Sequence, residues 1–243
     1  MTLSTIILAY QAEPLLKQAI DSVNFSDEII VVWDTSSDNI PPNFLSHIKL
    51  IKYPLRNFSS QRNLALKKVK GDWVLFLDSD EQVSPKLAQQ IQQVTQKDKG
   101  INGYFIPRQD IFYGQKLKYG ETGSIKILRL ARCGAGKFKR AVHETWKIRG
   151  QVEELSSPIF HYRRNLTTVF MEKMIKYSLL DAYELKKEGK PFACWRVVAY
   201  PMAKLFQNYF WRLGFLDGLL GFFHAYLMSI QSLTVRVYQW ERV

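Results

Sequence analysis

Gly71–Glu81 has the sequence GDWVLFLDSDE, an uninterrupted apolar run that ends abruptly in acidic residues. Such a run, without polar alternation, is typical of a strand buried on both faces of a sheet. We therefore predict a strand over Trp73–Leu77, followed by the carboxylates of Asp78 and Asp80. Two carboxylates this close together can reach one divalent cation. The alternative is an ordinary polar turn that precedes the next helix.

Three further apolar runs come before this one, at Leu3–Ala9, Glu28–Trp33 and Ile48–Tyr53. Helical spacing of apolar residues fills the intervals at Glu13–Val23 and Ser59–Val69. Another helix should follow the acidic turn, with a serine cap at 84 and a proline at its first position. Continuous apolar strands that alternate with helices predict an α/β domain with a Rossmann-like, mostly parallel sheet covered on both faces.

Polar residues follow three of these strands. Tyr10 and Gln11 follow the first, Asp34 follows the second, and Asp78 and Asp80 follow the fourth. Ligands of parallel sheets bind beyond the carboxyl ends of the strands, so this edge is the expected site. No G-x-G-x-x-G or Walker A loop occurs in the sequence, which disfavours dinucleotide binding and P-loop chemistry.

Charge and aromatic content divide the 243 residues unevenly. Residues 1–100 carry 11 Lys+Arg and 11 Asp+Glu, so the whole net charge of +12 lies in residues 101–243. Residues 191–243 hold 13 of the 33 aromatic residues. The pattern is helical from Leu166 onward, with a break at Gly189–Pro191. We predict an α/β domain over residues 1–165 and a helical, amphipathic extension over residues 166–243.

Four motifs follow one another in the first half: Ile7–Gln11 (ILAYQ), Phe25–Asp38 (FSDEIIVVWDTSSD), Ser60–Ala65 (SQRNLA) and Gly71–Glu81. Together they resemble the inverting glycosyltransferases of family 2, which share the nucleotide-sugar-binding GT-A fold. Gln11 and Ser36 depart from the usual Asn and Gly. The QxxRW motif of processive members is missing, which favours a single transfer.

Three later motifs resemble one subgroup of that family, the lipopolysaccharide core β-1,4-glucosyltransferases. They are Val142–Glu144, Pro158–Tyr162 and Gly214–Gly221. The resemblance covers nearly the whole chain and weakens between Lys86 and Arg129. It implies a metal-dependent enzyme that moves a hexose, with glucose favoured, from a UDP-sugar to a lipid-linked saccharide such as a lipopolysaccharide core.

The resemblance also implies roles for single residues in donor binding. Tyr10 would line the nucleobase pocket, and Gln11 would also bind the nucleotide-sugar. Asp34 would hold the uridine, and Arg62 would lie near the nucleotide. Asp78 and Asp80 would hold the ribose and the metal–diphosphate. A Mg²⁺ or Mn²⁺ ion between carboxylates and diphosphate would turn repulsion into attraction and stabilise the leaving group.

An inverting transfer needs one base, which deprotonates the acceptor hydroxyl. Glu144 is the candidate, because it follows an irregular basic segment that we expect to close over the donor. His143 would contact the diphosphate or the metal, and His161 is a further metal ligand candidate. The alternative for each histidine is a hydrogen-bonded structural role. The basic residues at 129, 132, 137, 139 and 140 form either a loop that contacts anions or a solvated face.

The C-terminal segment favours a peripheral position at an anionic membrane surface, on the cytoplasmic face of a bacterial inner membrane. Its aromatic residues would insert at the interface, while Lys204, Arg212 and Arg236 would meet lipid phosphates. A spanning helix is disfavoured, because Leu213–Ile230 contains Asp217. The alternative is a helical subdomain that packs on the α/β core or on a second subunit, so the oligomeric state stays open.

Three other functions fit parts of the sequence. The acceptor could be a capsule or exopolysaccharide lipid intermediate instead of a lipopolysaccharide core. The charge of +12 would also suit a non-catalytic basic module for membranes or nucleic acid, but Asp34, Asp78 and Asp80 would repel nucleic acid, so no nucleic-acid partner is expected. A nucleotidyltransferase usually has a Gly-rich basic loop after the first strand, and Gln11–Lys17 contains no glycine.

Overall fold

The computed structural model describes residues 1–9, 14–35, 48–54, 57–97, 99–123, 125–139, 145–163 and 166–241. These residues form two compact units. The sheet unit comprises Met1–Arg108 and Lys126–Tyr162, and the helical unit comprises Gln109–Ile125 and Arg163–Val243. The predicted domain boundary at residue 165 stays a prediction, to which the structure adds that residues 109–125 belong with the helices.

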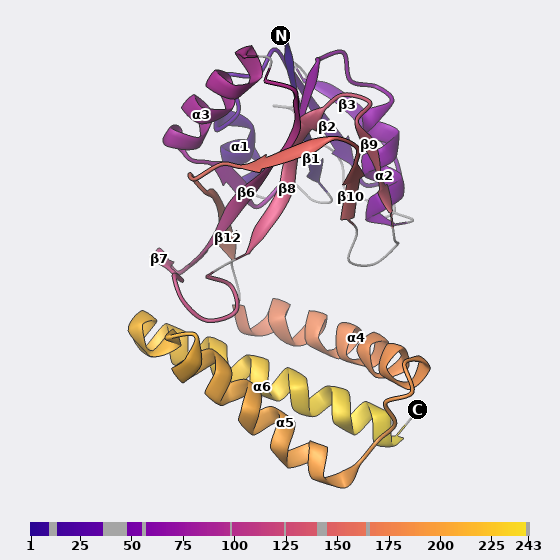
Figure 1. Cartoon of the computed structure of the whole chain (residues 1–243), viewed down its shortest axis with the longest axis vertical. Coiled ribbons are helices and arrows are strands. Elements are labelled where there is room, and N and C mark those ends of the chain that lie inside the picture. Colours follow the sequence, from indigo (N-terminus) through magenta and orange to yellow (C-terminus); the bar gives the residue numbers. More distant parts are fainter. Residues whose placement is uncertain are drawn as a thin grey trace. The chain divides into compact units, whose positions relative to one another are not determined.

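The sheet unit is built on the predicted α/β pattern (Figure 1). Its sheet has the strand order β3-β2-β1-β4-β8-β6-β12-β5, with β11 paired to β6. The first four strands are mutually parallel, and β8 is antiparallel to both β4 and β6. The strands are β1 (Leu3–Ala9), β2 (Glu28–Trp33), β3 (Lys49–Lys52), β4 (Trp73–Asp78), β5 (Glu81–Val83), β6 (Ile101–Phe112), β8 (Lys126–Arg132), β11 (Gln151–Glu154) and β12 (Ile159–Arg163).

Both faces of the central strands are covered, as their uninterrupted apolar sequences predict. Ile7 of β1 belongs to a buried cluster with residues of α1 (Pro14–Asp21) and α3 (Pro85–Gln96). Ile6 belongs to a second cluster with residues of α2 (Phe58–Leu66) and of the hairpin β9 (Gly136–Lys139) and β10 (Thr145–Ile148). Adjacent side chains of a strand point to opposite faces, so β1 is buried at every position, including Ser4 and Thr5.

Local capping fixes where two helices begin. The Ser84 hydroxyl accepts a hydrogen bond from the Leu87 N–H at 3.3 Å, and Pro85 stands at the first helical position of α3, which confirms the predicted cap. Asn57 caps α2 in the same way, because its side-chain oxygen accepts from the Ser60 N–H at 2.8 Å. Each cap satisfies one backbone donor that the first turn of a helix leaves unpaired.

The helical unit contains α4 (Leu166–Lys187), α5 (Cys194–Phe206) and α6 (Gly218–Glu241), and α4 and α5 both pack against α6. A π-helical turn over Gln207–Trp211 and a 3₁₀ turn over Gly214–Asp217 join α5 to α6. The glycine at 221 is required there, because a Cβ atom would lie 1.9 Å from the Gly214 carbonyl oxygen. Figure 1 shows the three helices side by side.

Residues 109–125 add a short hairpin to this unit. The strand β7 (Gln115–Lys116) pairs with the end of β6, and Phe112 and Leu117 form a small apolar cluster with side chains of α4 and α6. The carboxylate of Asp217 accepts hydrogen bonds from the backbone N–H groups of Lys118 and Tyr119, at 3.0 and 2.8 Å. The acid that disfavoured a spanning helix therefore has a structural role.

Candidate functional site in the sheet unit

The strand register brings the predicted acidic residues to one edge of the sheet. Asp78 of β4 pairs with Leu8 of β1, and the Ser79 N–H donates to the Leu8 carbonyl at 3.1 Å. Asp34 follows β2 directly, is buried, and donates its backbone N–H to the Ala9 carbonyl at 2.8 Å. Asp34, Asp78 and Asp80 thus share the carboxyl edge of the parallel strands, where such sheets bind ligands.

Two arginines hold the Asp78 carboxylate. The Arg62 Nη2 atom of α2 donates to its Oδ1 atom at 2.8 Å, and the Arg129 Nη2 atom of β8 donates to its Oδ2 atom at 2.6 Å. Both guanidinium groups are buried, with 7% and 4% of their side chains exposed. The Arg62 guanidinium also lies over the rings of Phe76 and Phe138, at 5.8 and 5.3 Å from their centroids.

Glu81 completes this network from the opposite side. Its Oε1 atom accepts from Arg129 at 2.9 Å, and its Oε2 atom accepts from the Asp78 backbone N–H at 3.0 Å. The Glu81 side chain is 1% exposed. Two buried arginines therefore face two acids, so the network as a whole is close to neutral. A buried ion pair requires such compensation, because each charge loses its hydration.

The pKa values follow from burial and from these charges. Burial raises the pKa of Asp78, but the nearby guanidinium groups of Arg129 and Arg62 outweigh burial and hold that pKa well below its ordinary value. Burial raises the pKa of Glu81, with Arg129 opposing the rise and the Asp78 charge adding to it. Asp78 is therefore ionised throughout the physiological range.

Asp80 lies outside the arginine network and faces His161. The His161 Nε2 atom is 3.2 Å from the Asp80 Oδ2 atom, and the Tyr162 N–H donates to the Asp80 carbonyl at 2.9 Å. His161 is held in place by β12, which pairs with β5 so that His161 lies opposite Glu81. A carboxylate and an imidazole from separate strands thus meet beside the turn that carries both acids.

Asp80 and His161 fit a divalent cation better than Asp78 does. Oxygen and imidazole ligands suit Mn²⁺, and a Mg²⁺ site commonly uses one or two carboxylates with substrate phosphates. Both oxygens of Asp78 already accept from guanidinium groups, so Asp78 as placed here does not fit a direct metal ligand. No group of three or more His, Cys, Asp or Glu side chains suited to a metal occurs among the described residues.

The strands that flank residues 140–144 are anchored to the same region. Asn63 of α2 donates its amide to the Phe138 carbonyl and accepts from the Phe138 N–H, both at 2.9 Å. The ring of Phe138 stacks on Trp146, and both rings meet Phe76 of β4 edge to face. Residues 140–144 themselves, with the predicted His143 and Glu144, lie outside the described residues, as do Tyr10 and Gln11.

The sequence analysis did not assign Arg129 and Glu81 to the site. Arg129 was grouped with basic residues of a loop or solvated face, whereas it is a buried strand residue that binds both acids. The signal was an arginine inside an apolar run, since a buried charge needs a partner. Lys137 and Lys139 are exposed on β9, as a solvated face requires.

Comparison with known proteins assigns this fold and site to a class. A family model for Glycosyl transferase family 2 matches residues 4–151, which is more than half of the chain. The chain therefore belongs to Glycosyl transferase family 2 and is a glycosyltransferase. The predicted class of enzyme is confirmed.

Two relatives extend the similarity to nearly the whole chain. The lipopolysaccharide core biosynthesis glycosyltransferase LpsC of Rhizobium meliloti is 24% identical over 245 residues, which cover 94% of this chain and 91% of that protein. An uncharacterized glycosyltransferase of Rickettsia typhi is 25% identical over 246 residues, which cover 93% of this chain and 82% of that protein.

A solved structure supports the predicted fold. The mannosyltransferase PcManGT from Pyrobaculum calidifontis, in complex with GDP-Man and Mn²⁺, matches with a TM-score of 0.57 at 13% identity. The match covers 99% of this chain and 88% of that chain. The GT-A fold predicted from the sequence is thereby confirmed.

Proposed function

We propose that the protein transfers a hexose, with glucose as the favoured sugar, from a UDP-sugar to a hydroxyl group of a lipid-linked saccharide such as a lipopolysaccharide core, with inversion at the transferred carbon. The lipopolysaccharide core role of the Rhizobium meliloti relative supports the acceptor, since that similarity spans 94% of this chain. The single observation that carries the proposal is the Asp80–His161 pair at the carboxyl edge of the sheet in a family 2 chain.

Donor binding would use this pair together with the arginine-held acid. A Mg²⁺ or Mn²⁺ ion held by Asp80 and His161 would supply positive charge to the leaving diphosphate. Asp78, whose carboxylate is fixed by Arg62 and Arg129, would be positioned for the ribose. Because the network of Asp78, Glu81 and the two arginines is near neutral, Asp80 contributes the negative charge that a cation would balance.

The remaining donor contacts follow the family resemblance. Asp34 at the end of β2 would hold the uridine, Tyr10 would line the nucleobase pocket, and Gln11 would also bind the nucleotide-sugar. A buried carboxylate such as Asp34 can accept the imide N–H of uracil. The expectation of a UDP-sugar as the donor rests on the family resemblance.

Glu144 would act as the base that removes the proton from the acceptor hydroxyl. It lies one residue before Thr145, which pairs with Lys139 across the β9–β10 hairpin. The bidentate contact of Asn63 and the rings of Phe138 and Trp146 fix that hairpin to α2 and β4. An anchored support is what a base needs, since proton transfer demands hydrogen-bond distance to the substrate.

The helical unit would place the enzyme at the membrane that carries the acceptor. Seven of the eight aromatic residues between positions 206 and 226 are exposed, namely Phe206, Phe210, Trp211, Phe215, Phe222, Phe223 and Tyr226. By length and composition alone, the helical run Gly214–Glu241 could also cross a membrane. We propose peripheral attachment to the cytoplasmic face of a bacterial inner membrane.

Two of the three cationic side chains that we expected to contact lipid phosphates are engaged in contacts within the protein instead. Arg236 is buried and lies over the ring of Tyr200, so it cannot reach a lipid headgroup as placed. Lys204 forms an ion pair with Glu121 at 2.9 Å. Arg212 is partly exposed and keeps the proposed role. The apolar side chains, more than cations, therefore support the membrane proposal.

A panel of donors tests the proposal. The full-length protein is titrated with UDP-, GDP- and dTDP-sugars with and without Mn²⁺, and sugar transfer is measured with deacylated and intact lipopolysaccharide core acceptors. We expect Mn²⁺-dependent binding of a UDP-sugar, and loss of that binding in Asp80→Ala. The matched control Asp21→Ala removes an exposed carboxylate from the end of α1 and should bind as the wild type does.

Three outcomes would contradict parts of the proposal. Preference for GDP- or dTDP-sugars would reject the UDP-sugar as the donor. Metal-independent binding that Asp80→Ala retains would reject the cation site. Transfer to a capsule or exopolysaccharide lipid intermediate, with none to the lipopolysaccharide core, would replace the acceptor.

A further inference from the structure

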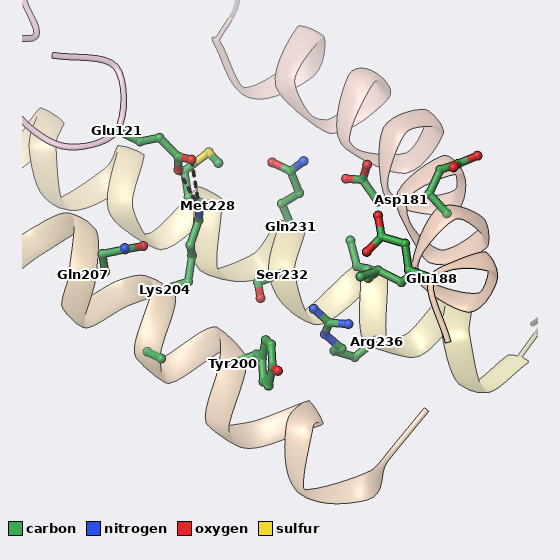
Figure 2. A pocket seen from close by; sticks show the side chains of 14 residues that line it. Glu121, Asp181, Glu188, Tyr200, Lys204, Gln207, Met228, Gln231, Ser232 and Arg236 are labelled. Atoms are coloured by element: carbon green, nitrogen blue, oxygen red, sulfur yellow. Dashed lines mark hydrogen bonds and ion pairs between the residues drawn. The ribbon is translucent and has the colours of Figure 1, made fainter. Parts of the chain in front are cut away.

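The helical unit contains a polar cavity of about 730 Å³, separate from the site described above. Figure 2 shows side chains of α4, α5 and α6 that converge on this cavity, together with Glu121 from the segment before them. The volume lies within the range of roughly 300–1,000 Å³ that is typical of ligand pockets. The lining side chains used below are Asp181, Glu188, Tyr200, Lys204, Gln231 and Arg236.

Arg236 is the feature that distinguishes this cavity from a solvated groove. Its side chain is buried, with 8% of the residue exposed, and its guanidinium lies 4.4 Å from the centroid of the Tyr200 ring. Its Nη1 atom donates to Gln239 at 2.6 Å, whereas its Nε atom has no hydrogen-bond partner among the described residues. The Nε atom is closed to solvent, so a ligand would meet the guanidinium only where Arg236 lines the cavity.

Hydrogen-bond acceptors surround the same space. Asp181, Glu184 and Glu188 lie three and four residues apart, so they share one face of α4 and its end, and all three line the cavity. Burial lowers the pKa of Arg236, and the charge of Asp181 is among those that oppose this lowering, which places the two groups within electrostatic reach of each other. Figure 2 shows Asp181 on α4 and Arg236 on α6.

Neutral polar groups and an aromatic ring complete the lining. Gln207, Gln231 and Ser232 each offer both donors and acceptors. The Tyr200 ring offers an apolar wall beside them. Donors, acceptors and one aromatic surface at short intervals match a molecule that carries many hydroxyl groups on an otherwise apolar ring.

We propose that this cavity of the helical unit binds an uncharged saccharide of two or three rings, outside the donor site of the sheet unit. Hydroxyl groups of the saccharide accept from Arg236 and Gln231 and donate to Asp181. The inference rests on the proposed function only in the expectation that the ligand is part of the acceptor saccharide. The carboxylates oppose an isolated phosphate, and the buried guanidinium opposes a simple cation.

Binding of neutral oligosaccharides tests this proposal. The full-length protein is titrated with a panel of gluco-, galacto- and manno-configured disaccharides and trisaccharides, followed by saturation-transfer NMR and calorimetry. We expect at least one member to bind. Asp181→Asn and Gln231→Ala should each weaken it by about three- to tenfold, the effect of one lost hydrogen bond.

Two comparisons keep the test specific. Glu172→Gln makes a similar change on α4 outside the cavity lining, and it should bind as the wild type does. Inorganic phosphate and spermidine serve as charged probes, and neither should compete with the oligosaccharide. Circular dichroism of each variant verifies that the helices are retained.

Several results would overturn the proposal. They are the absence of binding by every panel member at millimolar concentration, unchanged affinity in both Asp181→Asn and Gln231→Ala, and displacement of the sugar by phosphate or spermidine. UDP-sugar binding, measured on the same samples, separates this inference from the proposed function. Donor binding without oligosaccharide binding rejects the cavity alone, whereas oligosaccharide binding without donor binding rejects the proposed donor chemistry.

Discussion

The sheet unit buries most of its large apolar side chains, whereas the helical unit leaves about half of its own exposed. Among the described residues, the exposed large apolar side chains lie in the helical unit apart from Met1, Phe58 and Val152. The sheet unit instead encloses charges, since Arg62, Arg129 and Glu81 are all buried. The first unit therefore has the interior of a soluble enzyme, and the second has a surface suited to an apolar environment.

This contrast matches the proposed division between chemistry and membrane attachment. In the sheet unit, two buried arginines fix a carboxylate at the strand edge where the donor is proposed to bind. In the helical unit, exposed rings contact one another but stay in water, and they would gain free energy by leaving it. The four predictions below test one half of the contrast or the other, beginning with the largest effect.

Glu144→Gln should lower the rate of sugar transfer by about 10²- to 10⁴-fold, the usual contribution of a general base. Donor affinity should stay unchanged, because the amide keeps the shape of the carboxylate. Steady-state transfer assays and UDP-sugar titration measure the two quantities separately. Turnover at the wild-type rate would remove Glu144 from this role, and a loss of donor binding would assign it to the donor instead.

Arg129→Met should destabilise the sheet unit by about 3–5 kcal/mol, because it leaves Glu81 and Asp78 without their shared cation. Urea unfolding of the full chain measures the loss. Lys137→Met, on an exposed position of β9, is the matched control and should stay within about 0.5 kcal/mol of the wild type. The double variant Arg129→Met/Glu81→Gln should be more stable than Arg129→Met alone, because it removes one of the unpaired charges. If the losses in free energy of unfolding of the two single variants simply add in the double variant, the two residues do not form a buried network.

Trp211→Ser should weaken binding to anionic liposomes, since burial of a large apolar side chain contributes about 1.5–3 kcal/mol. Trp211 is 78% exposed, so the change should leave the fold intact. Flotation with phosphatidylglycerol vesicles measures the binding. Phe58→Ser removes an exposed ring from the sheet unit and should have no effect. Equal binding by all three proteins would contradict the proposed attachment surface.

The smallest effect is expected for His224→Gln, which should reduce the pH dependence of the stability of the helical unit. Burial lowers the pKa of His224 from the ordinary 6.5; Arg163 lowers it further, while Asp110, Glu121 and Asp217 oppose the shift. Because the folded pKa lies below the unfolded one, stability is complete above pH 6.5 and falls as the pH drops through the folded value. Urea unfolding at several pH values between 7 and 5 should therefore show that the free energy of unfolding falls more steeply with decreasing pH in the wild type than in His224→Gln. Equal pH dependence in the two proteins would contradict this prediction.

The elements of the sheet unit were predictable because their signals are local. The apolar runs at Leu3–Ala9 and Glu28–Trp33 predicted β1 and β2 to the residue. The Ser84 cap and Pro85 predicted the start of α3. The expected helix over Ser59–Val69 begins one residue earlier in the structure, because Asn57 supplies its cap, and it ends at Leu66. Caps and apolar periodicity act within a few residues, so a sequence displays them.

The partners of charged residues were not predictable in the same way. Arg129 is 51 residues from Asp78, and Arg236 is 36 residues from Tyr200, with no spacing rule to join either pair. The two arginines were expected at surfaces, because arginine is usually exposed. Only the antiparallel pairing of β8 with β4, and the packing of α5 on α6, bring these groups together.

The sequence by itself determined the alternation of strands and helices, the acidic turn that ends β4, and the motifs that assign the chain to its family. Tertiary structure alone decided that Asp78 is held by two arginines, that Asp80 faces His161, and that polar side chains of three helices line one open cavity. The reason is physical. Hydrogen bonding and periodic burial are set by neighbours along the chain, whereas the charge that balances a buried group is set by neighbours in space.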